Sequence, residues 1–289
     1  TQPPQLNANI SVQGVLTCIN LSVTATANVS GGVGPYTYEW SGGQTGNPAQ
    51  LTTPGSHIVT VTDNNGCTKT AQTTVNSNLV PPNAEAGPTV TLTCAQPQKT
   101  LNGAGSSQGP TISYQWTASN GGNIVSGANT LTPLVNAAGT YTLVVTNATN
   151  GCTSEDMTTV SSSIQPPTAS ATGGVLSCAN PTVTLTATTN ASNPTFAWSG
   201  PGGYSSNQQN PSANTAGTYT VVITNTANGC TNSATASVTQ NTTPPTASAV
   251  AETLTCADTL AQITTTTNAN PATFAWSGPN NYNSTVQNP

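Results

Sequence analysis

The same series of short motifs runs through the chain three times in full and a fourth time in part. Each copy opens on a Pro-Pro pair and continues with Leu-x-Cys, aromatic-x-Trp, Gly-x-His/Tyr and Asn-Gly-Cys-Thr, and the fourth copy contains only the first three of these five. Self-similarity at a period of about 80 residues predicts a tandem array of small domains. The predicted domains are repeat 1 (1–80), repeat 2 (81–165), repeat 3 (166–243) and an incomplete repeat 4 (244–289), which we expect to continue in the same chain.

The motifs predict strands and turns. In aromatic-x-Trp two rings stand two residues apart, so on a strand both fall on one face, which we expect to be the core. The predicted core tryptophans are Trp40, Trp116, Trp198 and Trp276. Asn-Gly predicts a two-residue hairpin turn before each return strand. Without any convincing helical periodicity, the pattern predicts an all-β fold, a tandem array of β-sandwich domains.

Composition excludes several partners. Only 2 of the 289 residues are Lys or Arg and 7 are Asp or Glu, which is 3% against roughly 25% in an ordinary protein. With so few cations the chain is a poor partner for nucleic acid or an anionic membrane. No run of 18 apolar residues is present, so we expect no membrane insertion.

The seven cysteines predict one disulfide within each domain. The expected pairs are Cys18–Cys67, Cys94–Cys152 and Cys178–Cys230, with Cys256 lacking a partner in the chain. We expect each bridge to lie at one pole of its sandwich, because a disulfide cannot join opposite poles. Small domains with one Trp each have thin cores that such bridges stabilise. Buried free thiols and metal binding are the weaker alternatives, since there is a single His.

The runs GPYTYEWSGG and GSHIVTVTDNNGCT resemble the repeats of very large Bacteroidota surface adhesins, the SprB-type proteins of gliding motility, and more distantly PKD-like and other immunoglobulin-like modules. The resemblance covers three full copies and part of a fourth. It implies a tandem array of immunoglobulin-like β-sandwich domains, exported by the type IX route and displayed outside the cell or on its surface.

Catalysis is not expected. His57 is the only histidine, and Tyr141 and Tyr219 take its place in the other complete copies, which favours a core or tyrosine-corner position. The carboxylates are scattered over different repeats, so no cofactor is expected, although Glu85 and Glu252 near the linkers leave calcium binding between domains open.

We therefore expect a structural and adhesive protein, part of a long surface stalk or filament, with like chains or an extracellular polysaccharide as partner. The alternative is an array of carbohydrate-binding modules in which Tyr36, Tyr204 and Tyr282 stack on sugar rings. Asp258-Thr259-Leu260 also matches a short O-glycosylation signal.

Overall fold

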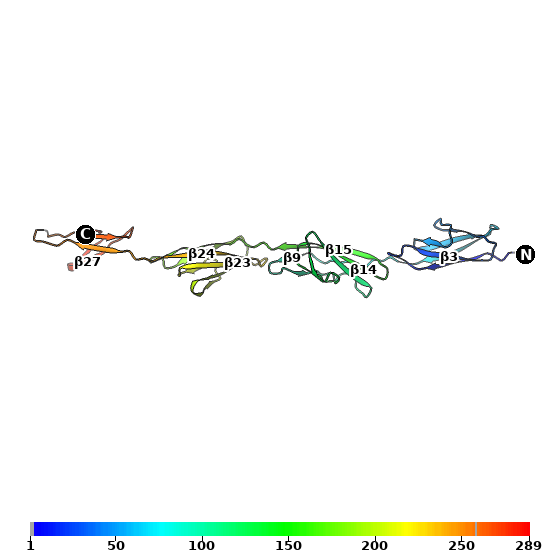
Figure 1. Ribbon diagram of the computed structural model, residues 1–289, viewed down its shortest axis with the longest axis horizontal. Coiled ribbons are helices and arrows are strands. Elements are labelled where there is room, and N and C mark those ends of the chain that lie inside the picture. Colours follow the sequence, from blue (N-terminus) through cyan, green and yellow to red (C-terminus); the bar gives the residue numbers. More distant parts are fainter. Residues whose placement is uncertain (1–2, 258) are drawn as a thin grey trace. The chain divides into compact units, whose positions relative to one another are not determined.

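The computed structural model describes residues 3–257 and 259–289, so Asp258 of the short glycosylation motif lies outside the described residues. The chain divides into two compact units, Thr1–Gln165 and Pro166–Pro289. The first unit contains the strands of repeats 1 and 2, and the second contains those of repeats 3 and 4 (Figure 1). The four domain boundaries themselves remain a prediction.

Repeat 1 forms two three-stranded antiparallel sheets, β1-β3-β5 and β4-β6-β7, and a short parallel pair, β2-β8. Its strands are β1 (Asn7–Gln13), β2 (Leu16–Thr17), β3 (Val23–Ser30), β4 (Thr37–Trp40), β5 (Ala49–Leu51), β6 (Gly55–Thr62), β7 (Thr68–Val75) and β8 (Ser77–Asn78).

Repeat 2 has a four-stranded sheet, β11-β14-β15-β9, and a three-stranded sheet, β10-β13-β12. Strands β14 and β15 lie side by side in Figure 1, and β15 runs parallel to β9. The strands are β9 (Val90–Thr93), β10 (Lys99–Thr100), β11 (Ile112–Ser119), β12 (Ile124–Ser126), β13 (Leu134–Val135), β14 (Gly139–Asn147) and β15 (Thr153–Ser163).

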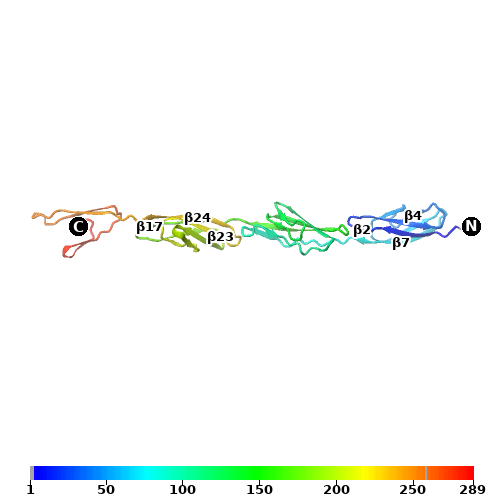
Figure 2. The ribbon, with the colours of Figure 1, turned by 60° about the horizontal axis from the view of Figure 1, so that its bottom comes forward.

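Repeat 3 is built around a five-stranded sheet, β17-β24-β23-β20-β21, with two short pairs, β16-β19 and β18-β22. Strands β23 and β24 lie side by side in both ribbon views (Figures 1 and 2). The elements are β16 (Ser170–Thr172), β17 (Val175–Ser177), β18 (Val183–Thr184), β19 (Thr186–Thr188), β20 (Pro194–Gly200), the 3-10 turn η1 (Pro201–Gly203), β21 (Tyr204–Ser206), β22 (Ser212–Ala213), β23 (Gly217–Asn225) and β24 (Thr231–Asn241).

Repeat 4 has two hairpin-like pairs, β25-β26 and β27-β28. Its elements are β25 (Ala247–Ala251), β26 (Ile263–Thr267), β27 (Trp276–Gly278), the 3-10 turn η2 (Pro279–Asn281) and β28 (Tyr282–Ser284). Throughout the part of the chain that the structure describes, the regular elements are strands and these two 3-10 turns, which confirms the predicted all-β, immunoglobulin-like fold.

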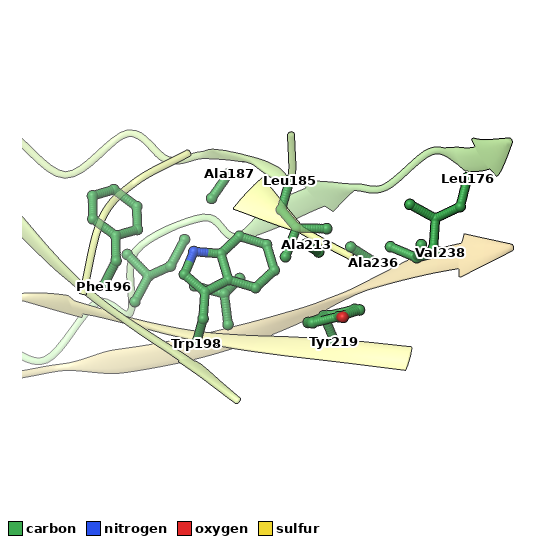
Figure 3. Packing of buried hydrophobic residues seen from close by; sticks show 11 residues of the cluster. Leu176, Leu185, Ala187, Phe196, Trp198, Ala213, Tyr219, Ala236 and Val238 are labelled. Atoms are coloured by element: carbon green, nitrogen blue, oxygen red, sulfur yellow. The ribbon is translucent and has the colours of Figure 1, made fainter. Parts of the chain in front are cut away.

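Each complete repeat has its own core around the tryptophan of the aromatic-x-Trp strand. Trp40, Trp116 and Trp198 are at most 2% exposed. Each faces an aliphatic residue on the neighbouring strand, as Trp198 faces Val221. The indole N–H of each donates to a backbone carbonyl oxygen, Gly46 in the case of Trp40 at 2.8 Å, so the polar edge of the ring is satisfied. Figure 3 shows Trp198 in repeat 3 among apolar side chains from facing strands. Trp276 of repeat 4 is half-buried.

The Asn-Gly hairpins exist, but their turns are wider than predicted. A two-residue type I′ turn needs positive φ at both residues. Only the glycines, Gly66, Gly151 and Gly229, have positive φ, and the strands are joined by loops such as Asp63–Cys67. The predicted two-residue turn is therefore wrong, because the asparagine takes part in a longer hydrogen-bonded loop.

The disulfide pairing predicted within each repeat is also wrong. Cys18 is bonded to Cys152, while Cys67 and Cys178 are free, which contradicts all three expected pairs. Between Cys18 and Cys67 the chain passes along β3, β4, β5 and β6. Strands β4 and β5 run in the same direction, so the number of traverses is odd and the two cysteines lie at opposite ends of repeat 1.

Candidate functional site

The most elaborate polar arrangement in the first unit is the junction between repeats 1 and 2. It brings together the Leu-x-Cys segment of repeat 1, which we call the corner (Leu16–Asn20), and the Asn-Gly-Cys segment of repeat 2, which we call the loop (Asn147–Cys152).

The corner lies where the chain leaves repeat 1. Strand β2 pairs in parallel with β8, the last strand of the repeat, so Cys18 stands next to the start of the linker. Leu16 anchors the corner in the core and is 2% exposed. A tight turn follows, in which the Thr17 N–H donates to the Asn20 carbonyl oxygen at 2.9 Å and the Asn20 N–H donates to Thr17 Oγ1 at 2.9 Å.

The loop of repeat 2 closes on Asn147. The Asn147 N–H donates to the Cys152 carbonyl oxygen at 3.0 Å, and the Gly151 N–H donates to the Asn147 carbonyl oxygen at 2.7 Å. These bonds place Asn150 and Cys152 at the tip, where both are 1% exposed.

The disulfide joins corner and loop with a Cα–Cα distance of 5.0 Å between Cys18 and Cys152. Beside it, the Cys18 N–H donates to the Asn150 carbonyl oxygen at 3.0 Å. The Asn150 side-chain amide donates to Asn78 Oδ1 at 3.1 Å and to the Val80 carbonyl oxygen at 2.9 Å. Asn150 therefore contacts the corner, the last strand and the linker of the preceding repeat.

Every polar group of Asn150 has a partner in this junction. Its Oδ1 accepts from the Cys152 N–H at 3.0 Å, and its own N–H donates to the Asn147 carbonyl oxygen at 3.3 Å. Removing one partner of a buried polar group costs about 1–3 kcal/mol, so this asparagine makes the junction specific as well as stable.

Gly151 completes the fit. Its φ is +68°, a conformation that favours glycine, and a Cβ there would lie 2.3 Å from Cγ2 of Ile19. The corner thus packs directly on the glycine of the loop, and any side chain at 151 would displace Ile19.

Repeat 3 has the same loop. Within it the Gly229 N–H donates to the Asn225 carbonyl oxygen at 2.7 Å and the Cys230 N–H donates to Asn228 Oδ1 at 3.0 Å. Asn228 is 5% exposed. Cys94, the corner cysteine of repeat 2, and Cys230 are both disulfide-bonded.

Repeat 1 has a loop that is one residue shorter, in which Asp63 takes two roles. The Asp63 N–H donates to the Cys67 carbonyl oxygen at 3.0 Å, as Asn147 does in repeat 2, while Asp63 Oδ1 accepts from the Cys67 N–H at 2.8 Å, as Asn150 does. Burial raises the pKa of Asp63, but backbone N–H donation from Val33, Cys67 and Asn65 outweighs it and holds the pKa below its ordinary value of 3.8. Asn65 and Cys67 are exposed.

The histidine of repeat 1 and the tyrosines in its place have a common structural role. The Tyr141 and Tyr219 hydroxyls donate to the carbonyl oxygens of Ala137 and Thr215, four residues earlier. His57 Nε2 lies 2.8 Å from the Thr53 carbonyl oxygen, again four residues earlier, and His57 is 8% exposed. This arrangement resembles a tyrosine corner.

The three tyrosines considered for sugar stacking are not alike. Tyr36 donates to the Gly31 carbonyl oxygen at 2.7 Å and packs against the core of repeat 1. Tyr204 packs edge-on against Tyr219, with ring centroids 4.9 Å apart, and donates to the Ser212 carbonyl oxygen at 2.9 Å. Tyr282 is 45% exposed. Stacking on sugars remains untested for all three.

Burial raises the pKa of the Tyr204 hydroxyl, and Tyr219 raises it further, so Tyr204 acts as a neutral hydrogen-bond donor.

The two linker carboxylates have different neighbours. Beside Glu85, the Ala86 N–H donates to Asp156 Oδ2 at 2.7 Å. Glu252 accepts from the Gln262 N–H at 3.3 Å, and Glu85 is exposed. Among the described residues no group of three or more His, Cys, Asp or Glu side chains could hold a metal ion. Calcium binding at the linkers stays a prediction. Within the same residues no helix has the length and apolar character needed to span a membrane.

Two segments of the chain match known family profiles. Residues 16–45 match the family profile of the SprB repeat, and residues 81–162 match that of the PKD-like domain. A search of curated proteins found no match.

The matches cover a segment of repeat 1 and nearly all of repeat 2, and they agree with the resemblance to SprB-type and PKD-like repeats predicted from the sequence. These families are structural and adhesion repeats rather than enzymes, and they support an extracellular adhesin-type repeat protein.

Matches among solved structures include immunoglobulin domains 1–5 of Sidekick-1, at 13% identity over 82% of this chain and 60% of that one, with a TM-score of 0.30. The titin I-band fragment I67–I69 matches at 13% identity over 83% of this chain and 99% of that one, with a TM-score of 0.32. The eight N-terminal domains of Down Syndrome Cell Adhesion Molecule match at 13% identity over 92% of this chain and 39% of that one, with a TM-score of 0.33.

Proposed function

We propose that the chain is a load-bearing segment of an extracellular stalk, displayed on a bacterial surface by the type IX route in the manner of SprB-type adhesins. The observation that carries the proposal is the Cys18–Cys152 disulfide, which joins one repeat to the next in parallel with the peptide linker. A chain that only holds two points apart needs no more than the peptide linker between its repeats. A covalent bridge across the junction between repeats 1 and 2 also resists extension.

The bridge changes how the chain responds to a pulling force. The bond holds Cys18 and Cys152 together, so the segment between them, a sequence separation of 134, cannot add to the length of the pulled chain. At about 3.3–3.6 Å per extended residue, roughly 450 Å of chain cannot be drawn out while the bond is intact.

Single-molecule force spectroscopy tests this directly. Because Cys94 and Cys230 are also disulfide-bonded, the test uses the Cys94→Ser background. In that background we expect the oxidised chain to show no extension from the segment between Cys18 and Cys152, and a reductant to add roughly 450 Å to its final length. Adding Cys18→Ser to the same background should show the added length without reductant. Cys178→Ser, which removes a free exposed thiol, should behave like the unmodified chain. Full extension of the oxidised chain would contradict the proposal.

A carbohydrate-binding array has less support. The rings of Tyr36 and Tyr204 pack against the cores of their own repeats, and both hydroxyls donate to backbone carbonyl oxygens.

A further inference from the structure

The dipeptide Asn-Gly occurs five times in the chain, at Asn65, Asn102, Asn120, Asn150 and Asn228. It is prone to spontaneous loss of ammonia, because the glycine nitrogen can attack the side-chain amide before it without obstruction from a side chain of its own. In a folded protein the reaction depends on whether the glycine N–H is already held by an acceptor, and on whether the backbone can bring the nitrogen to the amide carbon. The five copies differ in both respects.

At four of the five positions the glycine N–H donates to a backbone carbonyl oxygen. The acceptors are Asp63 for Gly66 at 3.0 Å, Leu131 for Gly103 at 2.8 Å, Asn147 for Gly151 at 2.7 Å and Asn225 for Gly229 at 2.7 Å. Asn150 and Asn228 are buried as well. Attack on any of these four asparagines therefore requires a hydrogen bond to open first.

Asn120 and Gly121 form a tight turn between β11 and β12. The φ of Asn120 is +53° and that of Gly121 is +90°, and the Gly122 N–H donates to the Ser119 carbonyl oxygen at 3.0 Å. These values are typical of a two-residue type I′ turn, in which the N–H of the second central residue takes no part in the bond that closes the turn. Among the hydrogen bonds of the described residues, none is donated by the Gly121 N–H, and both turn residues are exposed. The Asn120 amide donates to Thr140 Oγ1 at 3.2 Å, a single contact at the surface.

This turn is also one peptide rotation away from the geometry that ring closure needs. A type II′ turn has a ψ of roughly −120° at its first central residue, and the five-membered imide ring of an L-residue imposes a similar ψ. Both turn types keep φ positive at that residue, so Asn120 keeps its φ while the peptide group between Asn120 and Gly121 turns over. Gly121 accepts the new φ because it has no side chain. Among the five asparagines, all of which the structure describes, Asn120 alone has a positive φ.

From the unheld N–H and the positive φ we infer that Asn120 is a built-in modification site, at which the folded chain spontaneously forms a cyclic imide and gains a carboxylate. The product adds one negative charge to a chain whose formal net charge is −5 and which has two basic residues. The reaction needs no pulling force and no second repeat, so it goes beyond the proposed function.

The reaction proceeds in two steps. The Gly121 nitrogen loses its proton and attacks the Cγ atom of Asn120, so that a new C–N bond closes the ring while the bond from Cγ to the amide nitrogen breaks and ammonia leaves with the proton. Water then opens the imide at one of its two C–N bonds. Breaking the new bond leaves an aspartate at position 120, and breaking the original main-chain bond leaves an isoaspartate, whose backbone is one methylene longer. No oxidant or reductant takes part.

The test is to age the full chain, folded and with its disulfides intact, at mildly alkaline pH and to measure the conversion at each Asn-Gly by peptide mass spectrometry. We expect Asn120 to convert first, with the other four asparagines at least about fivefold slower, the factor that corresponds to opening one backbone hydrogen bond. The same chain reduced and unfolded in urea should convert at all five positions at similar rates, because the local dipeptide is then the same.

A matched pair of variants reports on the intact protein. Asn120→Asp should remove most of the acidic shift that the ageing chain shows on isoelectric focusing. Asn65→Asp, at an exposed asparagine whose glycine N–H is held, should leave that shift in place. Conversion at Asn65 or at any of the other three asparagines as fast as at Asn120 would overturn the inference, because the dipeptide or its exposure alone would then decide the rate. An unchanged Asn120 in the folded chain, over a time in which the chain in urea is converted, would overturn it as well.

Discussion

A single glycine decides how closely two repeats approach. At Gly151 the loop needs both a positive φ and the absence of a side chain, since Ile19 lies where a Cβ would be. Gly66 needs only the positive φ, because nothing lies near its Cβ position. The two positions therefore separate backbone strain from packing across the junction.

We predict that Gly151→Ala weakens the Cys18–Cys152 bond against reduction, while Gly66→Ala does not. Both changes should cost about 1–2 kcal/mol of stability through strain at positive φ, and only Gly151→Ala also displaces Ile19. The measurement is the equilibrium between the protein disulfide and glutathione, alongside urea unfolding. If the two variants had equally stable disulfides, packing of Ile19 on the loop would have no role.

Asp63 gives the loop of repeat 1 a dependence on pH. Its pKa is lower in the folded protein than the ordinary value of 3.8, so the ionised form is the one that folding favours. The stabilisation is present above the unfolded-state pKa and is lost as the pH falls through the folded-state pKa.

We therefore predict that Asp63→Asn destabilises the protein most near pH 6, and that the difference from the unmodified chain shrinks as the pH falls below about 4. Thermal unfolding from pH 2 to pH 7 measures this. A difference that stayed constant down to pH 2 would show that the carboxylate charge contributes nothing and that only the shape of the side chain matters.

At the level of strands, the sequence predicts the long antiparallel elements well. Trp40 lies on β4, and the Gly55 and Gly66 motifs bound β6 and its return strand, because alternating side chains and turn residues report local conformation. Pairing of the cysteines depends instead on strand directions over the whole repeat. The three-residue strand β5 belongs to a different sheet from β4 and runs the same way, and no local pattern reveals that.

The two-residue strand β2 is the other element that local patterns miss. Its parallel pairing with β8 depends on residues some 60 positions away, yet it places Cys18 at the end of repeat 1 where the chain leaves. The polar contacts of Asn150 with Asn78 and Val80 likewise could not be predicted from the sequence, since an Asn before Gly is equally typical of an ordinary turn.

We predict that Cys18→Ser lowers the free energy of unfolding of the first unit by about 2–5 kcal/mol, because the bridge closes a segment of 134 residues and restricts the unfolded chain. Calorimetry or urea unfolding measures the loss, with Cys178→Ser as the control of the same chemistry at a free thiol. An unchanged unfolding curve for Cys18→Ser would show that the repeats are stable without their covalent connection.

At the scale of the whole molecule, the recurring motifs were enough to predict tandem β-sandwich repeats, because each complete repeat has its own tryptophan core. The covalent relation between successive repeats was predicted wrongly. It follows from the positions of corner and loop at opposite ends of a repeat, which a repeat period alone does not encode.

The junction also has a consequence for damage. The linker between repeats 1 and 2 contains Leu79 and Val80, which are 43% and 75% exposed and so are open to proteases. In an array whose repeats are joined by the peptide linker alone, a cut in the linker separates the chain into two pieces. Here the severed pieces stay joined through Cys18 and Cys152, so we predict that limited proteolysis at Leu79 or Val80 yields two fragments on a reducing gel and one intact species on a non-reducing gel. The Cys18→Ser variant should give two fragments under both conditions, so the disulfide makes this linker tolerant of a single break.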